Sequence, residues 1–433
     1  MRTSVAIVTL GCKTNQFESA AMSEQLCQAG YRQVAFEDGA ELVVVNTCTV
    51  TAATDAQSRK LIRRARRLNP QARIVVTGWY AQINPQSLNW LPGVSLVIGN
   101  QEKGQLLQYL VENNELGQIQ VSDIRNSSTI EPLSLTGFEQ RSRAFVQIQN
   151  GCDAFCSYCI IPYARGRSRS VQVVDVVAQI EKLSANGYPE IVLTGIHIGH
   201  YGHDLQPSID LLYLLMKIEE SNFSGRLRLG SIEPTELPED LYRYIVESSW
   251  ICPHFHIPLQ AGDNEILQRM NRHYSTDFFR DLVDKIHQLN PDAAIGLDVI
   301  TGFPGETEQQ FELTCRLLES LPFSHLHVFP FSQRTGTPAA TMPGQVSGTI
   351  IKERAALLRQ IGEKKHLNFS QRFIDSELEL VIEGGGTDGL RKGLSHNYLA
   401  VWVPATSVDP GVIVRVKIVG LCKDGLVGEV VSF

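Results

Sequence analysis

Short apolar runs alternate with longer amphipathic stretches through most of this 433-residue chain, and few folds accommodate that alternation. Strands separated by helices pair in parallel, and helices then cover both faces of the sheet. In the N-terminal part we expect strands at residues 4–10, 41–46, 72–77 and 96–99, and helices at residues 15–29, 53–68 and 102–112. The sequence therefore predicts an α/β fold that begins with a parallel-sheet domain.

After a polar stretch at residues 121–143, which we interpret as a linker, the alternation resumes. We expect six strands, at residues 144–148, 190–194, 226–229, 254–257, 294–300 and 325–329. The helices expected between them are residues 173–185, 208–220, 237–248, 277–288 and 308–321. Six units match a partial (β/α)6 barrel rather than a complete eight-fold one, and in such barrels the chemistry lies where the strands end.

The last part of the chain changes in character. A helical connector at residues 350–369 precedes glycine-punctuated strand candidates at residues 377–383, 398–403 and 412–420. This pattern predicts a small C-terminal β-barrel. We therefore divide the chain into three domains, at residues 1–125, 140–365 and 370–433.

Composition narrows the class of protein. The chain is 43% hydrophobic and 20% charged, as in ordinary globular proteins, and no apolar run approaches the roughly 18 residues that span a bilayer. We expect a cytoplasmic protein, because the apolar run at residues 5–10 is too short for a signal peptide. In a reducing compartment the nine cysteines favour metal ligation or catalysis over disulfides.

Three of these cysteines stand close together directly after the first predicted barrel strand. Cys152, Cys156 and Cys159 lie in the segment GCDAFCSYC. Three thiolates at this spacing can wrap one loop around three corners of a [4Fe–4S] cubane. No fourth cysteine follows at ferredoxin spacing, so one iron would remain open to a small ligand. The alternatives are a structural zinc site or three reduced core thiols.

The cysteine segment and three others carry a family resemblance. The run CxxxCxxC, with Tyr158 before its last cysteine, resembles the radical S-adenosylmethionine (SAM) superfamily. The longer strings RSRAFVQIQNGCDAFCSYCIIPYARG, CPHFHIPLQAGD, DVITGFPGET and HLHVFPFSQRTGTPA resemble the methylthiotransferases, most closely the MtaB type. The resemblance covers essentially the whole chain. It implies an N-terminal methylthiotransferase domain, a radical SAM barrel and a C-terminal TRAM domain that binds tRNA.

The resemblance also implies cofactors and a reaction. A cubane at Cys152, Cys156 and Cys159 would bind SAM, and its one-electron reduction would cleave SAM to a deoxyadenosyl radical. The implied reaction is methylthiolation of C2 of N6-threonylcarbamoyladenosine at position 37 of tRNA. The alternatives are methylthiolation of a ribosomal protein, or a tRNA-binding protein that cleaves SAM but has lost sulfur transfer. The candidate SAM contacts are Tyr158, Thr194, Gly195, Ser231, Glu233, His256, Gln260, Asp298, Gly302 and Phe329.

The N-terminal part departs from the family pattern at one position. The family places three more cysteines there to hold a second cluster, and Cys12 and Cys48 match two of them. The third position, in VTGWYAQ, is Trp79, whose indole has an N–H donor and no lone pair for a metal. We therefore expect one cluster rather than two. Three explanations stay open: an engineered or acquired substitution, a lineage that assembles the second cluster differently, and a chain that serves another reaction.

The four remaining cysteines have no partner at ligand spacing, and we expect structural roles for them. They are Cys27, Cys252, Cys315 and Cys422.

Basic residues gather at three places in a chain whose net charge is −7. One predicted helix carries Arg59, Arg63, Arg66 and Arg67 at spacings that share a face, which predicts a phosphate-binding stripe. A solvated helix face is the alternative. Two further groups are expected to contact RNA. They are Arg141, Arg143, Arg165, Arg167 and Arg169 around the cysteine loop, and Arg391, Lys392, His396 and Tyr398 near the C-terminus. We expect a monomer whose partners are the tRNA anticodon loop, an electron donor and a sulfur source.

Overall fold

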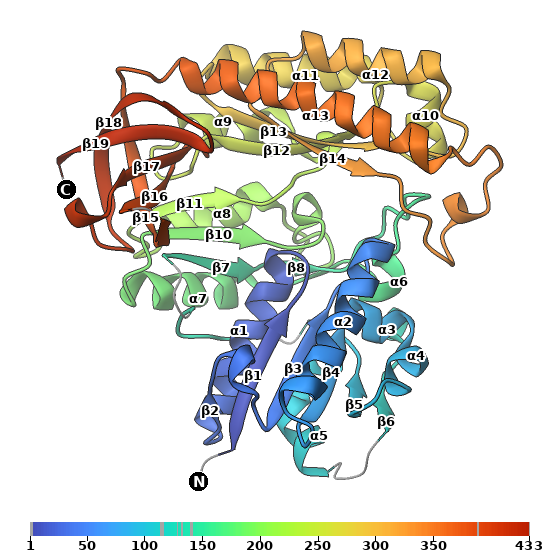
Figure 1. Ribbon diagram of the computed structural model, residues 1–433. Helices are drawn as coiled ribbons and strands as arrows, with labels where there is room; N and C mark the ends of the chain where they lie inside the picture. Colours follow the sequence, from blue (N-terminus) through green and yellow to red (C-terminus); the bar gives the residue numbers. More distant parts are fainter. Residues whose placement is uncertain are drawn as a thin grey trace. The chain divides into compact units, whose positions relative to one another are not determined.

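The computed structural model describes residues 3–112, 117–127, 129–130, 133–138, 142–387 and 389–432 (Figure 1). The chain divides into two compact units. Unit 1 comprises Met1–Gly137, Gln147–Asp175 and Ser332–Ala340. Unit 2 comprises Phe138–Val146, Val176–Phe331 and Thr341–Phe433. The three-domain division expected from the sequence stays a prediction.

Unit 1 contains a parallel sheet in the order β2-β1-β3-β4-β5-β6. Its strands are β1 Ser4–Thr9, β2 Arg32–Gln33, β3 Leu42–Thr47, β4 Arg73–Gly78, β5 Val94–Ile98 and β6 Gln118–Gln120. Its helices include α1 Lys13–Gln28, α2 Ala52–Leu68, α3 Trp79–Ile83, α4 Pro85–Asn89 and α5 Leu106–Glu112. The predicted N-terminal α/β fold is confirmed.

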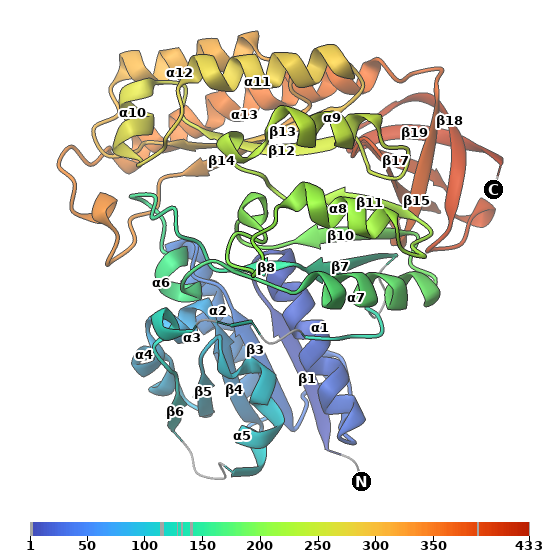
Figure 2. The ribbon, with the colours of Figure 1, turned by 180° about the vertical axis from the view of Figure 1, so that it is seen from behind.

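Successive side chains of a strand point to opposite faces of the sheet, and each face has its own hydrophobic core. Val44 packs with residues of α1 and α5, whereas Val43 and Val45 pack with residues of α2, α3 and α4. Helices therefore cover both faces of the sheet (Figures 1 and 2). The expected helix at residues 102–112 is wrong in its first turn, because a 3-10 turn at Glu102–Gln105 precedes α5.

A returning segment completes unit 1. Residues Ser332–Ala340, which we call the strap, lie far along the chain but belong to this unit. Arg334 of the strap donates hydrogen bonds to Thr49 Oγ1 at 2.5 Å and to Asp55 Oδ2 at 2.7 Å. The amide of Ala339 donates to the carbonyl of Ser157 in the cysteine loop at 2.8 Å. The strap therefore connects the start of α2 to the cysteine loop.

Unit 2 contains the strands of the predicted barrel. They form the sheets β11-β10-β7 and β12-β13-β14, and parallel bridges from Leu227 to Ile251 and from Ser231 to His256 connect the two. The strands are β7 Arg143–Gln147, β10 Glu190–Thr194, β11 Arg226–Leu229, β12 His254–Gln260, β13 Ala294–Thr301 and β14 His325–Pro330. The helices are α7 Val173–Ala185, α8 Leu211–Glu219, α9 Glu239–Glu247, α10 Asn264–Arg269, α11 Thr276–Leu289, α12 Glu308–Ser320 and α13 Gly348–Gln371. The partial barrel expected from the sequence is confirmed.

The C-terminal part of unit 2 is a closed barrel in the order β15-β16-β17-β19-β18. Its strands are β15 Glu377–Thr387, β16 Leu390–Ser395, β17 Ala400–Pro404, β18 Ile413–Cys422 and β19 Gly425–Ser432. The expected small β-barrel is confirmed, but the sequence pattern missed β16 and β19, in which glycine and charged residues interrupt the apolar alternation. Within the described residues, every helix is too short or too polar to span a bilayer.

Candidate functional site

The first candidate site lies at the edge of the unit 1 sheet. β1, β3 and β4 are parallel neighbours, with Thr9 opposite Asn46 and Asn46 opposite Thr77. Because parallel neighbours end at the same edge, the residues that follow the three strands come together. The residues gathered in this way are Cys12, Cys48 and Trp79.

The two cysteines of this edge follow neighbouring strands but differ in exposure. A Cβ atom at Gly11 would lie 2.9 Å from the Sγ of Cys48, and Gly11 has a φ of 100°, so only glycine fits this turn. Cys48 is 3% exposed. Cys12 is exposed and is the residue from which α1 begins.

Trp79 occupies the third position of the edge. It is the first residue of α3 and is 2% exposed. The Cζ atom of Arg165 lies 5.0 Å from the centroid of the indole ring, within cation–π range. The indole Nε1 has no hydrogen-bond partner among the described residues. The side chain thus fills space at the site and brings no metal-binding atom to it.

A buried group of charges lies beside the indole. The Glu18 carboxylate accepts hydrogen bonds from Lys103 and Arg165, and Arg165 also donates to Asn15 Oδ1 at 2.7 Å. Burial raises the pKa of Glu18, but Arg165 and Lys103 outweigh burial and hold that pKa at about 2. Burial lowers the pKa of Lys103 to about 8. At neutral pH the group therefore has two positive charges and one negative charge.

Buried asparagines fix the strand ends that carry the cysteines. Asn15 Nδ2 donates to the carbonyls of Leu10 at 2.7 Å and Thr47 at 3.1 Å. Asn46 Nδ2 donates to the carbonyl of Asn15 at 3.0 Å. Sequence reasoning missed Asn15, Asn46, Glu18 and Lys103. The available signal was that the buried positions of α1, which include residues 15, 18, 19 and 22, are partly polar.

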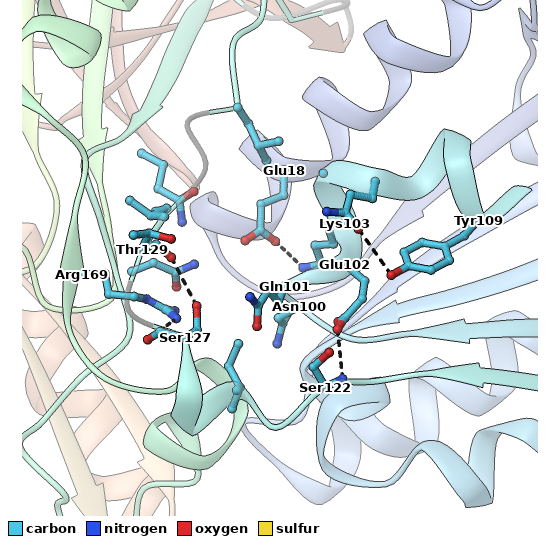
Figure 3. A pocket seen from close by; sticks show the side chains of 17 residues that line it. Glu18, Asn100, Gln101, Glu102, Lys103, Tyr109, Ser122, Ser127, Thr129 and Arg169 are labelled. Atoms are coloured by element: carbon cyan, nitrogen blue, oxygen red, sulfur yellow. Dashed lines mark hydrogen bonds and ion pairs between the residues drawn. The ribbon is translucent and has the colours of Figure 1, made fainter.

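Glu18 and Lys103 also line a polar cavity of about 190 Å³ in unit 1, with their ion pair on its wall (Figure 3). Glu102, another lining residue, accepts a hydrogen bond from the amide of Ser122 at 3.0 Å. The polar lining continues with Asn100, Gln147, Asn150 and Arg169.

The loop with Cys152, Cys156 and Cys159 also belongs to unit 1. A Cβ atom at Gly151 would lie 1.8 Å from the carbonyl oxygen of Arg167, so the loop can close against that segment only with glycine there. The amide of Cys159 donates to the carbonyl of Cys156 at 2.9 Å, and Phe155 has a left-handed φ of 44°. These contacts hold the three thiols on one tightly turned loop.

The second candidate site lies on unit 2, where three neighbouring strands carry polar side chains. His256 Nε2 lies 2.8 Å from Asp298 Oδ1, and His327 Nδ1 lies 3.3 Å from the same oxygen. Burial raises the pKa of Asp298, but the two imidazoles outweigh burial and hold that pKa well below its usual range. The three ligand atoms lie within 4.8 Å of one another, close enough to share one divalent cation. Sequence reasoning missed His327, which lies on a strand interpreted as apolar.

The other candidate SAM contacts of unit 2 lie at or just beyond strand ends. Glu233 is paired with Arg272, so its charge is neutralised in the structure. The amide of Gly302 donates to Glu306 Oε2 at 2.7 Å. Phe329 on β14 is 40% exposed. The remaining positions are Thr194 and Gly195 after β10, Ser231 after β11, and Gln260 at the end of β12.

Comparison with known proteins assigns the family. Residues 4–99 match the uncharacterized protein family UPF0004, and residues 146–318 match the Radical SAM superfamily. A Bacillus subtilis protein named threonylcarbamoyladenosine tRNA methylthiotransferase MtaB is 40% identical over 96% of this chain and 93% of its own length. The chain belongs to the radical SAM methylthiotransferase family. It is therefore a radical SAM transferase, and its family implies a [4Fe–4S] cluster and SAM as cofactors.

Other relatives of this methylthiotransferase are more distant. A Clostridium perfringens tRNA-2-methylthio-N(6)-dimethylallyladenosine synthase is 32% identical over 98% of this chain and 97% of its own length. Among solved structures, the radical S-adenosylmethionine methyltransferase TsrM from Kitasatospora setae is 15% identical with a TM-score of 0.57. The match covers 78% of this chain and 77% of that one, and it shows the fold alone.

The two clusters expected of a methylthiotransferase differ in how well the residues fit them. Cys152, Cys156 and Cys159 fit the SAM-binding cluster, because one closed loop presents three thiol ligands. The second cluster does not fit. Its site offers the thiols of Cys12 and Cys48, while a buried indole fills the third position.

The structure contradicts the predicted RNA contact of two arginines in this methylthiotransferase. Arg165 is fully buried and bonded to Glu18, and Arg169 is 5% exposed and donates to the carbonyl of Arg165 at 2.6 Å. The prediction for both is wrong, because buried acceptors already engage these guanidinium groups. Arg167 is exposed, as phosphate binding requires.

The other residues predicted to contact RNA differ in how exposed they are. Arg63 and Arg67 of α2 are exposed, but Arg59 and Arg66 are half-buried, and Arg59 donates to Tyr80 Oη at 2.8 Å. Tyr398 is half-buried and its ring centroid lies 4.3 Å from that of His254, and its contact with RNA stays a prediction. Arg141 lies outside the described residues.

Proposed function

We propose that this protein attaches a methylthio group to C2 of N6-threonylcarbamoyladenosine at position 37 of tRNA. The observation that carries the proposal is the closed loop with Cys152, Cys156 and Cys159 in a chain 40% identical to a relative named for that nucleoside. The reaction would take place in the cytoplasm, with tRNA as the macromolecular partner and an external reductant.

In the proposed mechanism Cys152, Cys156 and Cys159 hold the [4Fe–4S] cluster. When bound, this cluster supplies the electron that cleaves SAM to a deoxyadenosyl radical. The chain itself holds and orients SAM. Asp298, kept ionised by His256 and His327, offers a carboxylate for the ammonium or ribose hydroxyls of SAM.

RNA binding is proposed for the exposed basic residues of unit 1. Arg63 and Arg67 are one helical turn apart on α2 and both exposed, so they can bind neighbouring phosphates. Arg167 adds a third exposed guanidinium next to the cysteine loop in sequence. An anticodon loop offers the splayed, unstacked bases that sequence-specific RNA enzymes require.

A second candidate function has one observation in its favour. Trp79 removes a ligand of the cluster that the family uses as its sulfur donor. A chain of this kind would bind tRNA and cleave SAM without transferring sulfur. The cysteine loop would then serve SAM cleavage alone.

The experiment that separates these functions uses anaerobically reconstituted protein, a reductant, SAM and tRNA bearing threonylcarbamoyladenosine. Nucleosides and deoxyadenosine are measured by mass spectrometry. The methylthiolated nucleoside together with deoxyadenosine supports the first function. Deoxyadenosine alone supports the second. A Cys152→Ala/Cys156→Ala/Cys159→Ala variant is the control, and wild-type protein that yields neither product contradicts both.

A further inference from the structure

We propose that Cys12 and Cys48 form a redox-active dithiol, which a low-molecular-weight disulfide converts into an intramolecular Cys12–Cys48 disulfide. This site would stand where the family places its second cluster. The inference depends on the geometry of unit 1 and not on the proposed reaction with tRNA.

The first argument is proximity. Cys12 and Cys48 follow neighbouring parallel strands, whose backbones lie about 4.8 Å apart. The amide of Leu10 still donates to the carbonyl of Asn46 at 2.9 Å beyond the end of β1, so the two segments stay together up to the cysteines. Continued beyond Thr9 and Asn46, this register sets Gly11 against Cys48, and a Cβ atom at Gly11 would lie 2.9 Å from the Sγ of Cys48. Cys12 is the next residue, so the two cysteines lie on adjoining turns within the backbone range of a disulfide, about 4.4–6.8 Å between Cα atoms of bonded cysteines.

The second argument is that no other described group competes for the thiols. Trp79 fills the third side of the site with an indole that cannot ligate a metal. Cys27 lies 15 residues after Cys12 in sequence and near the other end of α1, about 22 Å away at 1.5 Å per residue. Neither Trp79 nor Cys27 can therefore take the place of Cys48 as the partner of Cys12.

The third argument assigns a different role to each thiol. Cys12 is exposed at the N-terminus of the 16-residue helix α1, so a disulfide in solution can reach its sulfur. Cys48 is 3% exposed, so an external disulfide cannot reach its sulfur directly. Cys12 is thus the attacking thiol, and Cys48 is the resolving thiol.

The reaction balances without a metal. The Cys12 thiolate attacks a disulfide RSSR, a Cys12–SR bond forms, and RS⁻ leaves. The Cys48 thiolate then attacks the Cys12 sulfur, the Cys12–Cys48 bond forms, and a second RS⁻ leaves. Two electrons pass from the protein thiols to RSSR, and the two thiol protons go to the released thiolates.

The test uses the full-length protein after anaerobic reconstitution, with glutathione disulfide as the probe. Remaining thiols are blocked with N-ethylmaleimide, and the digested protein is analysed by mass spectrometry. We expect a peptide pair linked through Cys12 and Cys48. Cys48→Ser should instead accumulate a glutathione adduct on Cys12, whereas Cys12→Ser should leave Cys48 unmodified.

Iron and zinc are measured in the same preparations. We expect about four irons per chain in wild type, Cys12→Ser, Cys48→Ser and a Trp79→Phe control, because one cubane accounts for them. Trp79→Cys should gain iron and lose the linked peptides. About eight irons in wild type, bound zinc that Cys12→Ser removes, or an absent linked pair would each overturn the proposal. None of these readouts depends on whether tRNA is methylthiolated.

Discussion

Each unit of the molecule buries one carboxylate between cations, and the two arrangements differ in what else the cations contact. In unit 1 Glu18 pairs with Lys103 and Arg165. In unit 2 Glu190 accepts from Arg226 Nε at 2.7 Å and from Arg228 Nε at 2.8 Å. Burial raises the pKa of both carboxyls, but the neighbouring cations outweigh burial and hold each pKa at about 2.

The spare hydrogen-bond donors of the cations set the two networks apart. Arg165 also donates a hydrogen bond to Asn15, and its guanidinium group lies over the indole ring of Trp79 at the candidate thiol site. Arg226 and Arg228 donate to backbone carbonyls of the C-terminal barrel. In unit 1 the buried ion pairs therefore place charge beside the candidate thiol site. In unit 2 they connect the C-terminal β-barrel to a sheet.

The largest expected effect on stability comes from removing the charge of Glu190 in unit 2. Glu190→Gln should lower the free energy of unfolding by about 3–5 kcal/mol, because buried arginines lose their counter-charge. Urea denaturation of the full chain measures this. The matched control is Glu379→Gln, whose half-exposed carboxylate lies 3.9 Å from Arg226 and should contribute little. Equal effects of the two substitutions would contradict the assignment.

The next effect is a loss of stability at low pH, to which Glu18 and Glu190 both contribute. Below pH 4.5 the unfolded carboxyls of Glu18 and Glu190 take up protons, whereas the folded ones, with pKa values of about 2, do not. The free energy of unfolding should therefore fall as the pH drops from about 4.5 towards 2, by up to about 3 kcal/mol for each carboxyl. Denaturation curves between pH 7 and pH 3 measure this fall, which Glu190→Gln should reduce. A wild-type stability that does not change over this range would contradict it.

A smaller effect separates the two networks functionally. Glu18→Gln removes the one negative charge beside Arg165 and Lys103, so the local positive charge rises and a nearby thiolate is favoured. We expect Cys12 to react a few-fold faster with iodoacetamide at pH 7. Glu190→Gln, in the other unit, should leave this rate unchanged. A similar acceleration in both variants would point to general loosening instead.

The smallest effect on stability is expected for arginines outside both networks. Arg63→Gln/Arg67→Gln should change the free energy of unfolding by less than about 0.5 kcal/mol, since both side chains are exposed. The same variant should reduce the slope of log binding constant against log salt for tRNA by about 1.5 to 2. Filter binding across a salt series measures the slope. An unaltered slope would remove α2 from the RNA-binding surface.

Local pattern predicted most of the strands, because strand formation depends on residues close in sequence, whereas the expectation that Cys12 and Cys48 share a site came from the family resemblance. The strand that ends before Cys12 and the strand that ends before Cys48 are apolar runs, and their parallel order follows from the helix between them. The burial of Arg165 could not be predicted in this way. Its acceptor, Glu18, is 147 residues away, so a cluster of arginines in sequence looks the same whether exposed or buried.

The strap has a consequence for synthesis on the ribosome. Arg334 contacts Asp55 across 279 residues of sequence, and the intervening chain includes most of unit 2. At about 5–20 residues per second, roughly 15–60 s pass between the emergence of the two partners. The start of α2 must therefore wait, with Asp55 and Thr49 unpaired by Arg334, until the barrel strands have been made. Unit 1 is the first part to be translated, and it is complete only after most of unit 2 has been made.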